Sequence, residues 1–547
     1  MASLAPMTGT LGTRLAAHLL RRSTYFVNKA RIDQFAAMTP SQAVDTLFTQ
    51  APLIISEPLD PETGLPWINS GVESYSDAHD LLQAIGGWWI HEAIYDPSIV
   101  SKITFFLHAN FVISTEEFYP SRPFFDYLAL LRFYAKGSFK TIARKITLDN
   151  VMLSYLNGDS NTNTNPNENY AREFLELFTI GKGPQIGPDD YTNYTEMDVA
   201  AAAKLLSGFK ISDRPLPADP GSIDPDTGIT TGWAAYDDHD STDKQFSNAF
   251  GNLVITGAVD EEDMYRELDD FVDMVFDQDD TARTICRKLY RYFVSSSIDT
   301  EIETDIIEPL AQTMRTNDYN LEMTLKQLLK SQHFYDADDS SNTDEIIGAL
   351  LKSPLELLAH TVNFFNINIL PPQANSYEHY YEWYHISVID DILDKSGMKI
   401  FRPLNVAGYP AYYQEPLYHR NWLDASTIIA RYSLGEMLVT GMRVLSYGAL
   451  GGNIQVNMVD FVSNGIVSDP SVAAAIVDEL TPYLFPEPLI SERRTYFLDQ
   501  ILLGNLSQNN WYFEWLTYQN TGNSTSVKIK LNDLFKAVVY SREFQLM

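Results

Sequence analysis

The sequence predicts a mostly α-helical protein, a large multi-helix globular fold with long irregular loops and little or no β-sheet. Apolar residues recur three and four positions apart along most of the 547 residues, which is the period of an amphipathic helix. Runs that alternate between apolar and polar residues, as half-buried strands do, are scarce. Hydrophobic residues make up 45% of the chain, so material for a large core is ample.

Two helix starts carry capping signals. In DPSIVSKITFFLHANF, residues 96–111, Asp96 suits the N-cap and Pro97 the first helical position. TEMDVAAAAKLLSGF, residues 195–209, opens with a capping-box pattern from Thr195 to Asp198 and ends at Gly208, which suits the C′ position. Both patterns predict helices with defined ends.

Composition divides the chain into four expected parts of one continuous compact unit. These are an N-terminal helical part (1–210), a long polar loop insertion (211–258), a central helical part with Pro- and aromatic-rich loops (259–450) and a C-terminal helical part (451–547). Within them, segments 53–76 and 368–420 read as ordered loops. The length of the polar insertion is typical of functional loops or of disorder.

One helical segment is strongly acidic. VDEEDMYRELDDFVDMVFDQDD, residues 259–280, surrounds an apolar stripe with eleven acidic residues, a pattern typical of a solvated helix face. The next helical segment carries Arg283, Arg287, Lys288 and Arg291. We therefore interpret the acidic residues as a solvated surface that pairs with these neighbours.

Charge and motifs exclude several function classes. With 72 acidic and 39 basic residues the net charge is −33, which repels phosphate backbones and disfavours nucleic acid as a partner. No run of 18 apolar residues predicts a membrane span, and the N-terminal residues lack the pattern of a signal peptide, so the chain as written predicts a cytoplasmic location. The single cysteine, Cys286, excludes a disulfide framework.

Motifs of common enzyme classes are absent. The sequence contains no GxxxxGK[ST], no GxGxxG after a strand, no HExxH and no GxSxG, which disfavours NTPases, dinucleotide enzymes and the commonest zinc proteases and serine hydrolases. A Ser/His/Asp set assembled from distant segments stays open.

The candidate site lies in NGDSNTNTNPNENYAREFLELFTIGKG, residues 157–183. Asparagine or aspartate stands at every second position from 157 to 167, the spacing at which a calcium loop places oxygen ligands. The EF-hand template is not met, because Thr164 stands where glycine is needed and Tyr170 where the closing glutamate belongs. The hypothesis is a site of calcium type, with the candidate metal ligands Asp159, Asn161, Asn163, Glu168, His108 and Asp240.

The helix after this loop allows other interpretations. At about 100° per residue, Glu168, Arg172 and Glu176 share one stripe, with Glu173 about 60° from Glu176. Arg172 bridging the other two would form an i, i+4 ladder. If such pairs were buried, Arg172→Ala would cost about 3–5 kcal/mol.

The remaining interpretation is catalytic. Glu173 or Glu176 would act as the general base, with His239 as its partner. His239 lies in the polar loop YDDHDSTDK among acidic neighbours, which favour a protonated imidazole or a shared cation.

The order of several segments resembles the large bacterial domain-of-unknown-function family numbered 1800, over nearly the whole chain. The segments are AAHLLRRSTY (16–25), KITFFLHANF (102–111), PNENYAREFLELFTIG (166–181), YTEMDVAAAAKLLSGF (194–209), HDSTDK (239–244), ARTICRKLYRYFV (282–294), LLKSPLELL (350–358) and RPLNVAGYP (402–410) with Trp422. The resemblance implies a mostly helical fold, frequent export from the bacterial cytoplasm, and a gene neighbourhood with an alkaline-phosphatase-like family. It implies no established reaction.

Carried over by this resemblance, a structural polar core comprises His18, Arg22, Asn167, Arg172, Asp198 and Lys244. Phe178 stands where relatives often have histidine, and Phe209 and Tyr409 stand where they have tryptophan. The first hypothesis is a cation-stabilised interaction or scaffold protein that acts with a protein partner, for which the alkaline-phosphatase-like neighbour is the candidate. The resemblance implies an extracytoplasmic location, as in many relatives, as the alternative to the cytoplasmic one. The alternative is an enzyme with carboxylate and histidine acid-base or metal-assisted chemistry in a polar cleft around Glu173, Glu176 and His239.

Overall fold

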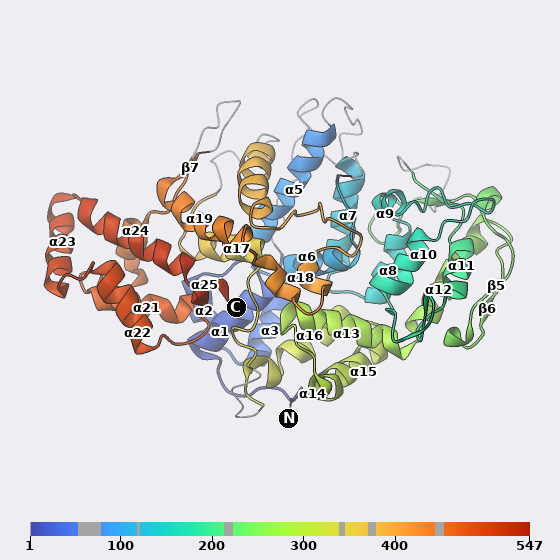
Figure 1. The fold of residues 1–547 in the computed structure, drawn as a ribbon, viewed down its shortest axis with the longest axis horizontal. Helices are drawn as coiled ribbons and strands as arrows, with labels where there is room; N and C mark the ends of the chain where they lie inside the picture. The colour runs from blue at the N-terminus through green and yellow to red at the C-terminus, as the bar shows by residue number, and fades with distance from the viewer. Residues whose placement is uncertain are drawn as a thin grey trace.

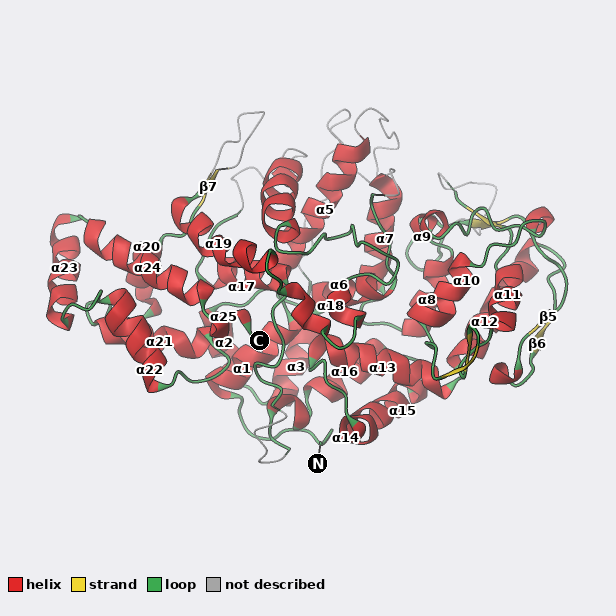
Figure 2. Ribbon diagram, viewed as in Figure 1, coloured by secondary structure: helices red, strands yellow, loops and turns green. Residues whose placement is uncertain are grey.

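The computed structural model describes residues 2–52, 78–116, 121–212, 223–338, 345–369, 379–443 and 453–547. Over these ranges the chain is mostly helical, and its strands form only two-stranded antiparallel sheets, which confirms the predicted fold class. Helices dominate every part of the molecule in Figure 2. The predicted loop at 53–76 lies outside the described residues, as do residues 213–222 of the polar insertion.

The N-terminal part is a succession of helices. They are α1 (Gly12–Ser23), α2 (Lys29–Ala36), α3 (Pro40–Thr49), α5 (Ala78–Tyr95), α6 (Val100–Asn110), α7 (Ser121–Phe133), α8 (Phe139–Thr147) and α9 (Asn150–Tyr155). Helix α6 begins at Val100, three residues after the predicted start at Pro97. The Asp96 carboxylate instead accepts the backbone N–H groups of Ser98 at 2.9 Å and Ser101 at 3.2 Å, which holds the turn before the helix.

One end of the elongated molecule carries the segment of the candidate site (Figure 1). Its elements are α10 (Asn169–Glu173), the π-helix η1 (Phe174–Phe178), β1 (Gln185–Gly187), β2 (Asp190–Tyr191), α11 (Glu196–Leu205), β3 (Phe209–Lys210), β4 (Trp233–Ala234), η3 (Tyr236–Asp238), β5 (Lys244–Gln245), η4 (Asn248–Phe250), β6 (Val254–Ile255) and α12 (Glu261–Phe276). Strand β1 pairs with β2, β3 with β4 and β5 with β6. The capping box of Thr195 and Asp198 is confirmed.

The middle of the molecule is formed by α1 to α3 together with the central helices (Figure 1). These are α13 (Asp279–Phe293), α14 (Thr300–Ile302), η5 (Glu303–Ile307), α15 (Glu308–Thr316), α16 (Leu321–Leu329), η6 (His333–Tyr335), α17 (Pro354–Phe364), η7 (His379–Asp394), α18 (Pro410–Tyr413), η8 (Tyr418–Trp422) and α19 (Thr427–Thr440).

The opposite end contains the C-terminal elements, and the chain then returns to the middle (Figure 1). They are β7 (Met442–Arg443), β8 (Asn453–Ile454), α20 (Met458–Phe461), η9 (Val462–Ile466), α21 (Ala473–Leu484), α22 (Ser491–Thr495), η10 (Tyr496–Leu502), α23 (Gln508–Thr521), α24 (Thr525–Tyr540) and α25 (Arg542–Gln545). Strand β7 pairs with β8. The buried hydrophobic residues of all these parts form one cluster; the four predicted chain divisions stay a prediction.

The prediction that residues 368–420 are loops is wrong for η7. This π-helix packs along α5, and its Tyr380 and Tyr384 are buried. Gly87 of α5 explains the close approach, because a side chain there would collide with the Tyr380 carbonyl and the Tyr384 side chain. No helix in the described ranges is long and apolar enough to cross a membrane.

Candidate functional site

The helix of the candidate site changes its geometry halfway along. It begins as α10 at Asn169, whose backbone N–H donates to Asn167 Oδ1 at 3.0 Å. After Glu173 it widens into the π-helix η1, with Phe174, Leu175 and Phe178 buried in the core. A π-turn contains more residues than an α-turn. The angular positions of side chains calculated at 100° per residue are therefore wrong beyond Glu173.

The predicted ladder through Arg172 is half right. Arg172 does pair with Glu168, with 3.1 Å between Nη2 and Oε2. Its main partner, however, is Glu196 at the start of α11, held by two parallel bonds of 2.5 and 2.8 Å. Glu176 instead contacts Lys182 Nζ at 2.6 Å and accepts a hydrogen bond from the Tyr194 hydroxyl at 3.0 Å. The π-turn moves Glu176 away from the stripe, which is the physical reason for the difference.

Arg172→Ala is expected to have a small effect, because its ion pairs are not buried. The Arg172, Glu168 and Glu196 side chains are 32%, 46% and 39% exposed. Solvent-exposed pairs contribute at most about 1 kcal/mol, so the free energy of unfolding should fall by no more than about 1 kcal/mol. Urea denaturation of the variant and the parent chain measures this. A loss of about 3–5 kcal/mol would restore the buried-pair interpretation.

Glu173 differs from its neighbours because its carboxylate is half-buried and makes no hydrogen bond or ion pair with the described residues. The pKa of Glu173 is raised to about 7, first by burial and then by the charge of Glu176, against the opposing effects of Arg172 and Lys182. A carboxyl group with this pKa exists in both protonation states near neutral pH. Glu173 can therefore give up or accept a proton, or bind a cation, under ordinary conditions.

The asparagine loop serves mainly to connect parts of the fold. Asn161 is buried; its side chain donates to Ala203 O at 2.8 Å and accepts from the Asn167 backbone at 2.9 Å. The Asn163 side chain donates to Asp237 O at 3.0 Å and to His239 O at 3.2 Å. The asparagine loop and the His239 loop thus meet, as the first hypothesis expects. The contacts are made to backbone carbonyl groups of the His239 loop and not to its side chains.

Other predicted ligands have partners of their own. The backbone carbonyl of Asp159 accepts Lys210 Nζ at 3.0 Å, and Asp240 Oδ1 accepts the Thr242 N–H at 2.9 Å. Within the described ranges, no group of three or more His, Cys, Asp and Glu side chains is arranged to hold a metal ion. The calcium site stays a prediction that these contacts do not support.

His239 belongs to a buried trio with Lys244 and Glu267. His239 Nε2 lies 2.6 Å from Glu267 Oε2, and Lys244 Nζ lies 2.5 Å from Glu267 Oε1, with all three side chains 0% exposed. The other ring nitrogen, Nδ1, lies 2.8 Å from Ser207 O, so both nitrogens of the imidazole face acceptors. The trio is sealed from solvent and shares no contact with Glu173 or Glu176 among the described residues.

The interpretation of the acidic segment as a solvated face is wrong at Glu267, which is buried. At about 100° per residue, Glu267 lies about 40° from Phe271 and so falls at the edge of the apolar stripe. This position on the helix was the one feature of the sequence that could have indicated a buried Glu267. The buried glutamate compensates the Lys244 and His239 side chains that the long loop inserts against α12.

His108 is a neutral core histidine. Its Nδ1 lies 3.0 Å from the Tyr127 hydroxyl and its Nε2 lies 3.1 Å from the Tyr409 hydroxyl. Burial lowers the pKa of His108 to about 3. Tyr409, one of the positions that depart from the family pattern, therefore supplies a partner for this ring. Phe178, another such position, packs edge-on against Phe111 in the core.

The remaining polar-core predictions are buried groups with defined partners. Asp198 accepts four hydrogen bonds, from the backbone and hydroxyl groups of Thr195 at 2.8 and 2.9 Å and of Ser247 at 2.6 and 2.7 Å. His18 Nε2 lies 2.9 Å from Phe334 O, and Arg22 Nη2 donates to Ile346 O at 2.7 Å. The last two lie in the middle of the molecule, in a different cluster from Asp198.

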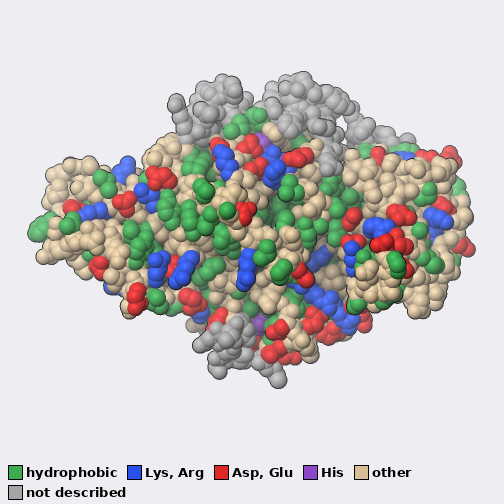
Figure 3. All heavy atoms as spheres, in the orientation of Figure 1, with side chains coloured by type: hydrophobic (Ala, Val, Ile, Leu, Met, Phe, Trp, Pro, Cys, Tyr) green, Lys and Arg blue, Asp and Glu red, His purple; other side chains and the backbone are tan. Residues whose placement is uncertain are grey.

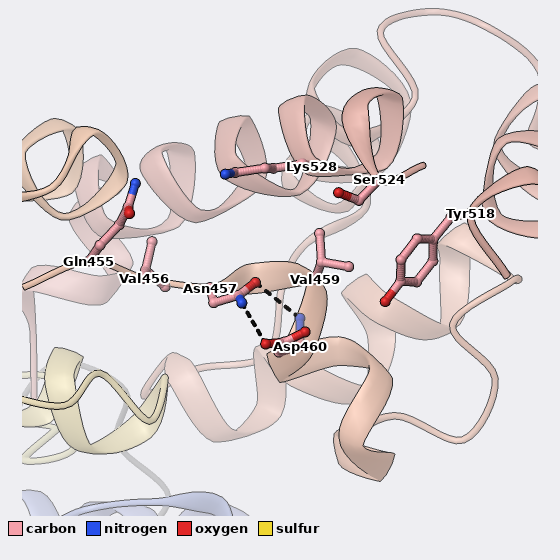
Figure 4. A pocket seen from close by; sticks show the side chains of 8 residues that line it. All are labelled: Gln455, Val456, Asn457, Val459, Asp460, Tyr518, Ser524 and Lys528. Carbon is pink, nitrogen blue, oxygen red and sulfur yellow. Dashed lines mark hydrogen bonds between the residues drawn. The ribbon is translucent and has the colours of Figure 1, made fainter. Parts of the chain in front are cut away.

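A separate surface pocket of about 280 Å³ opens at the C-terminal end of the molecule. In Figure 4, Asn457 and Asp460 are hydrogen-bonded to each other on one side of it, and Lys528, Ser524 and Tyr518 surround the other side. None of the predicted site residues lines it. It is therefore a cavity separate from the candidate site.

Fold and contacts together define a mostly helical protein in which polar clusters are built into a continuous core. No curated protein and no solved structure matches the chain. The chain belongs to the family described as protein of unknown function (DUF1800), which matches residues 18–546.

Proposed function

We propose that this protein is an interaction protein that binds a positively charged group at the carboxylate pair of Glu173 and Glu176. The observation that carries the proposal is the half-buried Glu173 carboxylate, which has no hydrogen-bond or ion-pair partner among the described residues and a pKa raised to about 7. A cation placed beside it would favour the ionised carboxylate and so offset the effects of burial and of the like charge of Glu176.

The surroundings favour a cation from outside. Lys182 already pairs with Glu176 at 2.6 Å, which leaves Glu173 as the uncompensated member of the pair. The net charge of −33 attracts cationic ligands from a distance. Figure 3 shows acidic and basic side chains side by side on this end of the molecule, an arrangement that suits a partner surface of mixed charge.

A basic side chain fits the site better than a calcium ion. Calcium requires six to eight oxygen ligands, whereas the oxygens of Asn161 and Glu168 already accept hydrogen bonds within the chain. An ammonium or guanidinium group needs only one or two carboxylates. The partner would therefore supply a lysine or arginine, and the alkaline-phosphatase-like neighbour that the resemblance implies is the first protein to test.

A general acid-base enzyme is the second candidate. A carboxyl group with a pKa near 7 is suited to proton transfer at neutral pH, and π-helical turns often occur at functional sites. In this version Glu173 is the catalytic group, and burial together with the charge of Glu176, which Tyr194 and Lys182 hold in place, raises its pKa. His239 takes no part, because its trio is sealed from solvent.

The binding proposal predicts a pH-dependent affinity. Binding of a hexa-arginine peptide, followed by titration calorimetry at pH 6, 7 and 8, should strengthen as Glu173 loses its proton. Glu173→Gln should weaken binding at pH 8 by about tenfold, or 1.4 kcal/mol, and remove most of the pH dependence. Near pH 7, peptide binding should also release protons, so the measured enthalpy should differ between buffers of different ionisation enthalpy.

Glu262→Gln is the matched control for this experiment. Glu262 is exposed on α12, and its replacement removes the same unit of charge. If both variants bind the peptide equally, the attraction is only the general charge of the protein and the proposal is wrong. If Glu173→Gln leaves binding unchanged but abolishes a catalytic activity of the protein, the acid-base candidate replaces it.

Glu173→Gln should also change how stability depends on pH. The pKa of Glu173 is raised from 4.5 to about 7 in the folded protein, so ionisation opposes folding as pH rises through this window. As pH rises from 4.5 to 7, the free energy of unfolding of the variant should therefore increase relative to that of the parent chain. Denaturation curves at pH 4, 6 and 8 test this, and a difference that does not vary with pH would contradict the raised pKa.

A further inference from the structure

A second surface pocket opens where α5, α7 and η7 meet. Helices α7 and η7 both pack against α5, and α5 and α7 lie side by side in Figure 1. Each of the three helices contributes to the lining, as does the segment 400–402 that follows η7, and the volume is about 170 Å³. None of the predicted site residues lines this pocket. It is therefore independent of the carboxylate pair of Glu173 and Glu176.

The wall of the pocket is mainly apolar. Leu82, Phe124, Ile389, Ile400 and Phe401 line it, and each is at most 3% exposed. Small-molecule pockets are typically apolar with a few polar groups that orient the ligand, but most are larger, at about 300 to 1,000 Å³. An engineered apolar cavity of about 150 Å³ in another protein binds benzene. The volume of this pocket therefore suits a ligand with a single ring.

Gly86 of α5 lines the pocket without being required by the packing of the helices. A Cβ atom at this position would come no closer than 3.6 Å to Phe401 and 3.7 Å to Ile389, which are ordinary van der Waals contacts. Gly87 is different, because a side chain there would collide with the Tyr380 carbonyl. Glycine in the middle of a helix is unfavourable relative to alanine. Packing does not account for Gly86, whereas space for a ligand does.

Two charged side chains on the rim have unused hydrogen-bonding groups. Arg402 Nη2 pairs with Asp390 at 3.2 Å and with Asp394 at 2.5 Å, but its Nε and Nη1 make no hydrogen bond with the described residues. The exposed Glu116 carboxylate makes no hydrogen bond or ion pair with these residues either. His385, which also lines the pocket, lies 3.6 Å from Asp390 Oδ1 through Nε2. The rim thus offers donors whose positive charge is compensated, and one free acceptor.

We propose that this pocket binds a neutral phenol with a single ring. The apolar wall and the space beside Gly86 take the ring. The phenol hydroxyl accepts a hydrogen bond from Arg402 and donates one to Glu116, so that each rim group gains a partner. An aromatic carboxylate is disfavoured, because Glu116 repels it and the charge of Arg402 is already balanced by Asp390 and Asp394.

Methyl NMR locates the ligand directly. In the full chain labelled at the isoleucine δ1 methyl groups, p-cresol should shift the signals of Ile389 and Ile400, which are identified by their loss in Ile389→Val and Ile400→Val. The shifts should saturate with a Kd of about 1 mM, as for a tight-fitting small fragment. Ile529, exposed on α24, should not shift. Shifts that do not saturate, or that are as large at Ile529, overturn the proposal, as does tighter binding of benzoate than of p-cresol.

Gly86→Ala tests the space for the ring in a variant that should fold well. Alanine causes no close contact here, so the variant should melt at the same temperature as the parent chain or higher. The Kd for p-cresol should rise about tenfold, because the added methyl group takes space in a small apolar pocket. An unchanged Kd in this variant would overturn the assignment to this pocket.

Glu116→Ala tests the contact with the hydroxyl group. It should raise the Kd for p-cresol about threefold through the loss of one hydrogen bond. Glu262→Ala removes an exposed carboxylate on α12 and should leave the Kd unchanged. Equal affinities of the two variants for p-cresol would contradict the role of Glu116 in recognising a phenol.

Discussion

Glu267→Ala is expected to lower the free energy of unfolding by about 3–5 kcal/mol. The glutamate contacts His239 at 2.6 Å and Lys244 at 2.5 Å, and all three side chains are fully buried. Its removal leaves a buried ammonium group without a counter-charge and leaves the Nε2 atom of His239 without its carboxylate partner. Urea denaturation of the parent chain and the variant, followed by circular dichroism, measures the difference.

Two further variants test whether this loss of stability comes from the buried ion pair. Glu262→Ala lies on the same helix but is exposed, so it should change stability by no more than about 0.5 kcal/mol. The double variant Lys244→Met with Glu267→Leu replaces the ion pair by apolar groups and should recover most of the loss. A Glu267→Ala loss no larger than that of Glu262→Ala would contradict the buried trio.

Glu356→Ala should have an effect at least as large, about 3–5 kcal/mol. The carboxylate pairs with buried Lys102 and completes the capping box of α17, and its charge also acts on the buried cations Arg22, Lys352 and Arg431. Its loss removes an N-terminal cap and leaves several interior charges unbalanced. The thermal midpoint and the urea midpoint should both fall together.

Glu436→Ala is the control for this prediction. Glu436 lies on α19 and is 53% exposed, where it pairs weakly with Lys536 at 3.4 Å. Its removal should cost no more than about 1 kcal/mol. If Glu356→Ala and Glu436→Ala destabilise the protein equally, the buried cations around Glu356 do not depend on its charge for stability.

The fold class was predictable because helix signals are local. Periodicity and caps identified α11 with its box at Thr195 and Asp198. The elements that periodicity and caps did not predict are determined by tertiary contacts. Helix η7 forms in a Pro- and aromatic-rich region because its tyrosines pack against α5 where Gly87 leaves space, and no pattern within residues 379–394 records the position of Gly87.

The candidate site was predictable in part. The sequence predicted a helix with Glu173, Glu176 and Arg172 as its polar residues, but it did not predict the π-turn in which Phe174 and Phe178 are buried. The sequence therefore predicted an ion pair between Glu176 and Arg172, whereas Arg172 forms this pair with Glu196. Partners from distant segments, such as Glu267 for His239, require the three-dimensional fold.

The most direct test of the proposed function is the titration of Glu173 itself. In protein labelled with ¹³C at the glutamate side-chain carboxyl groups, the signal that is lost in Glu173→Gln identifies this residue. The account predicts a midpoint at about pH 7, which should fall when a hexa-arginine peptide is bound, because a nearby cation favours the ionised form. A midpoint near the ordinary glutamate value of about 4.3, unchanged by the peptide, would contradict it.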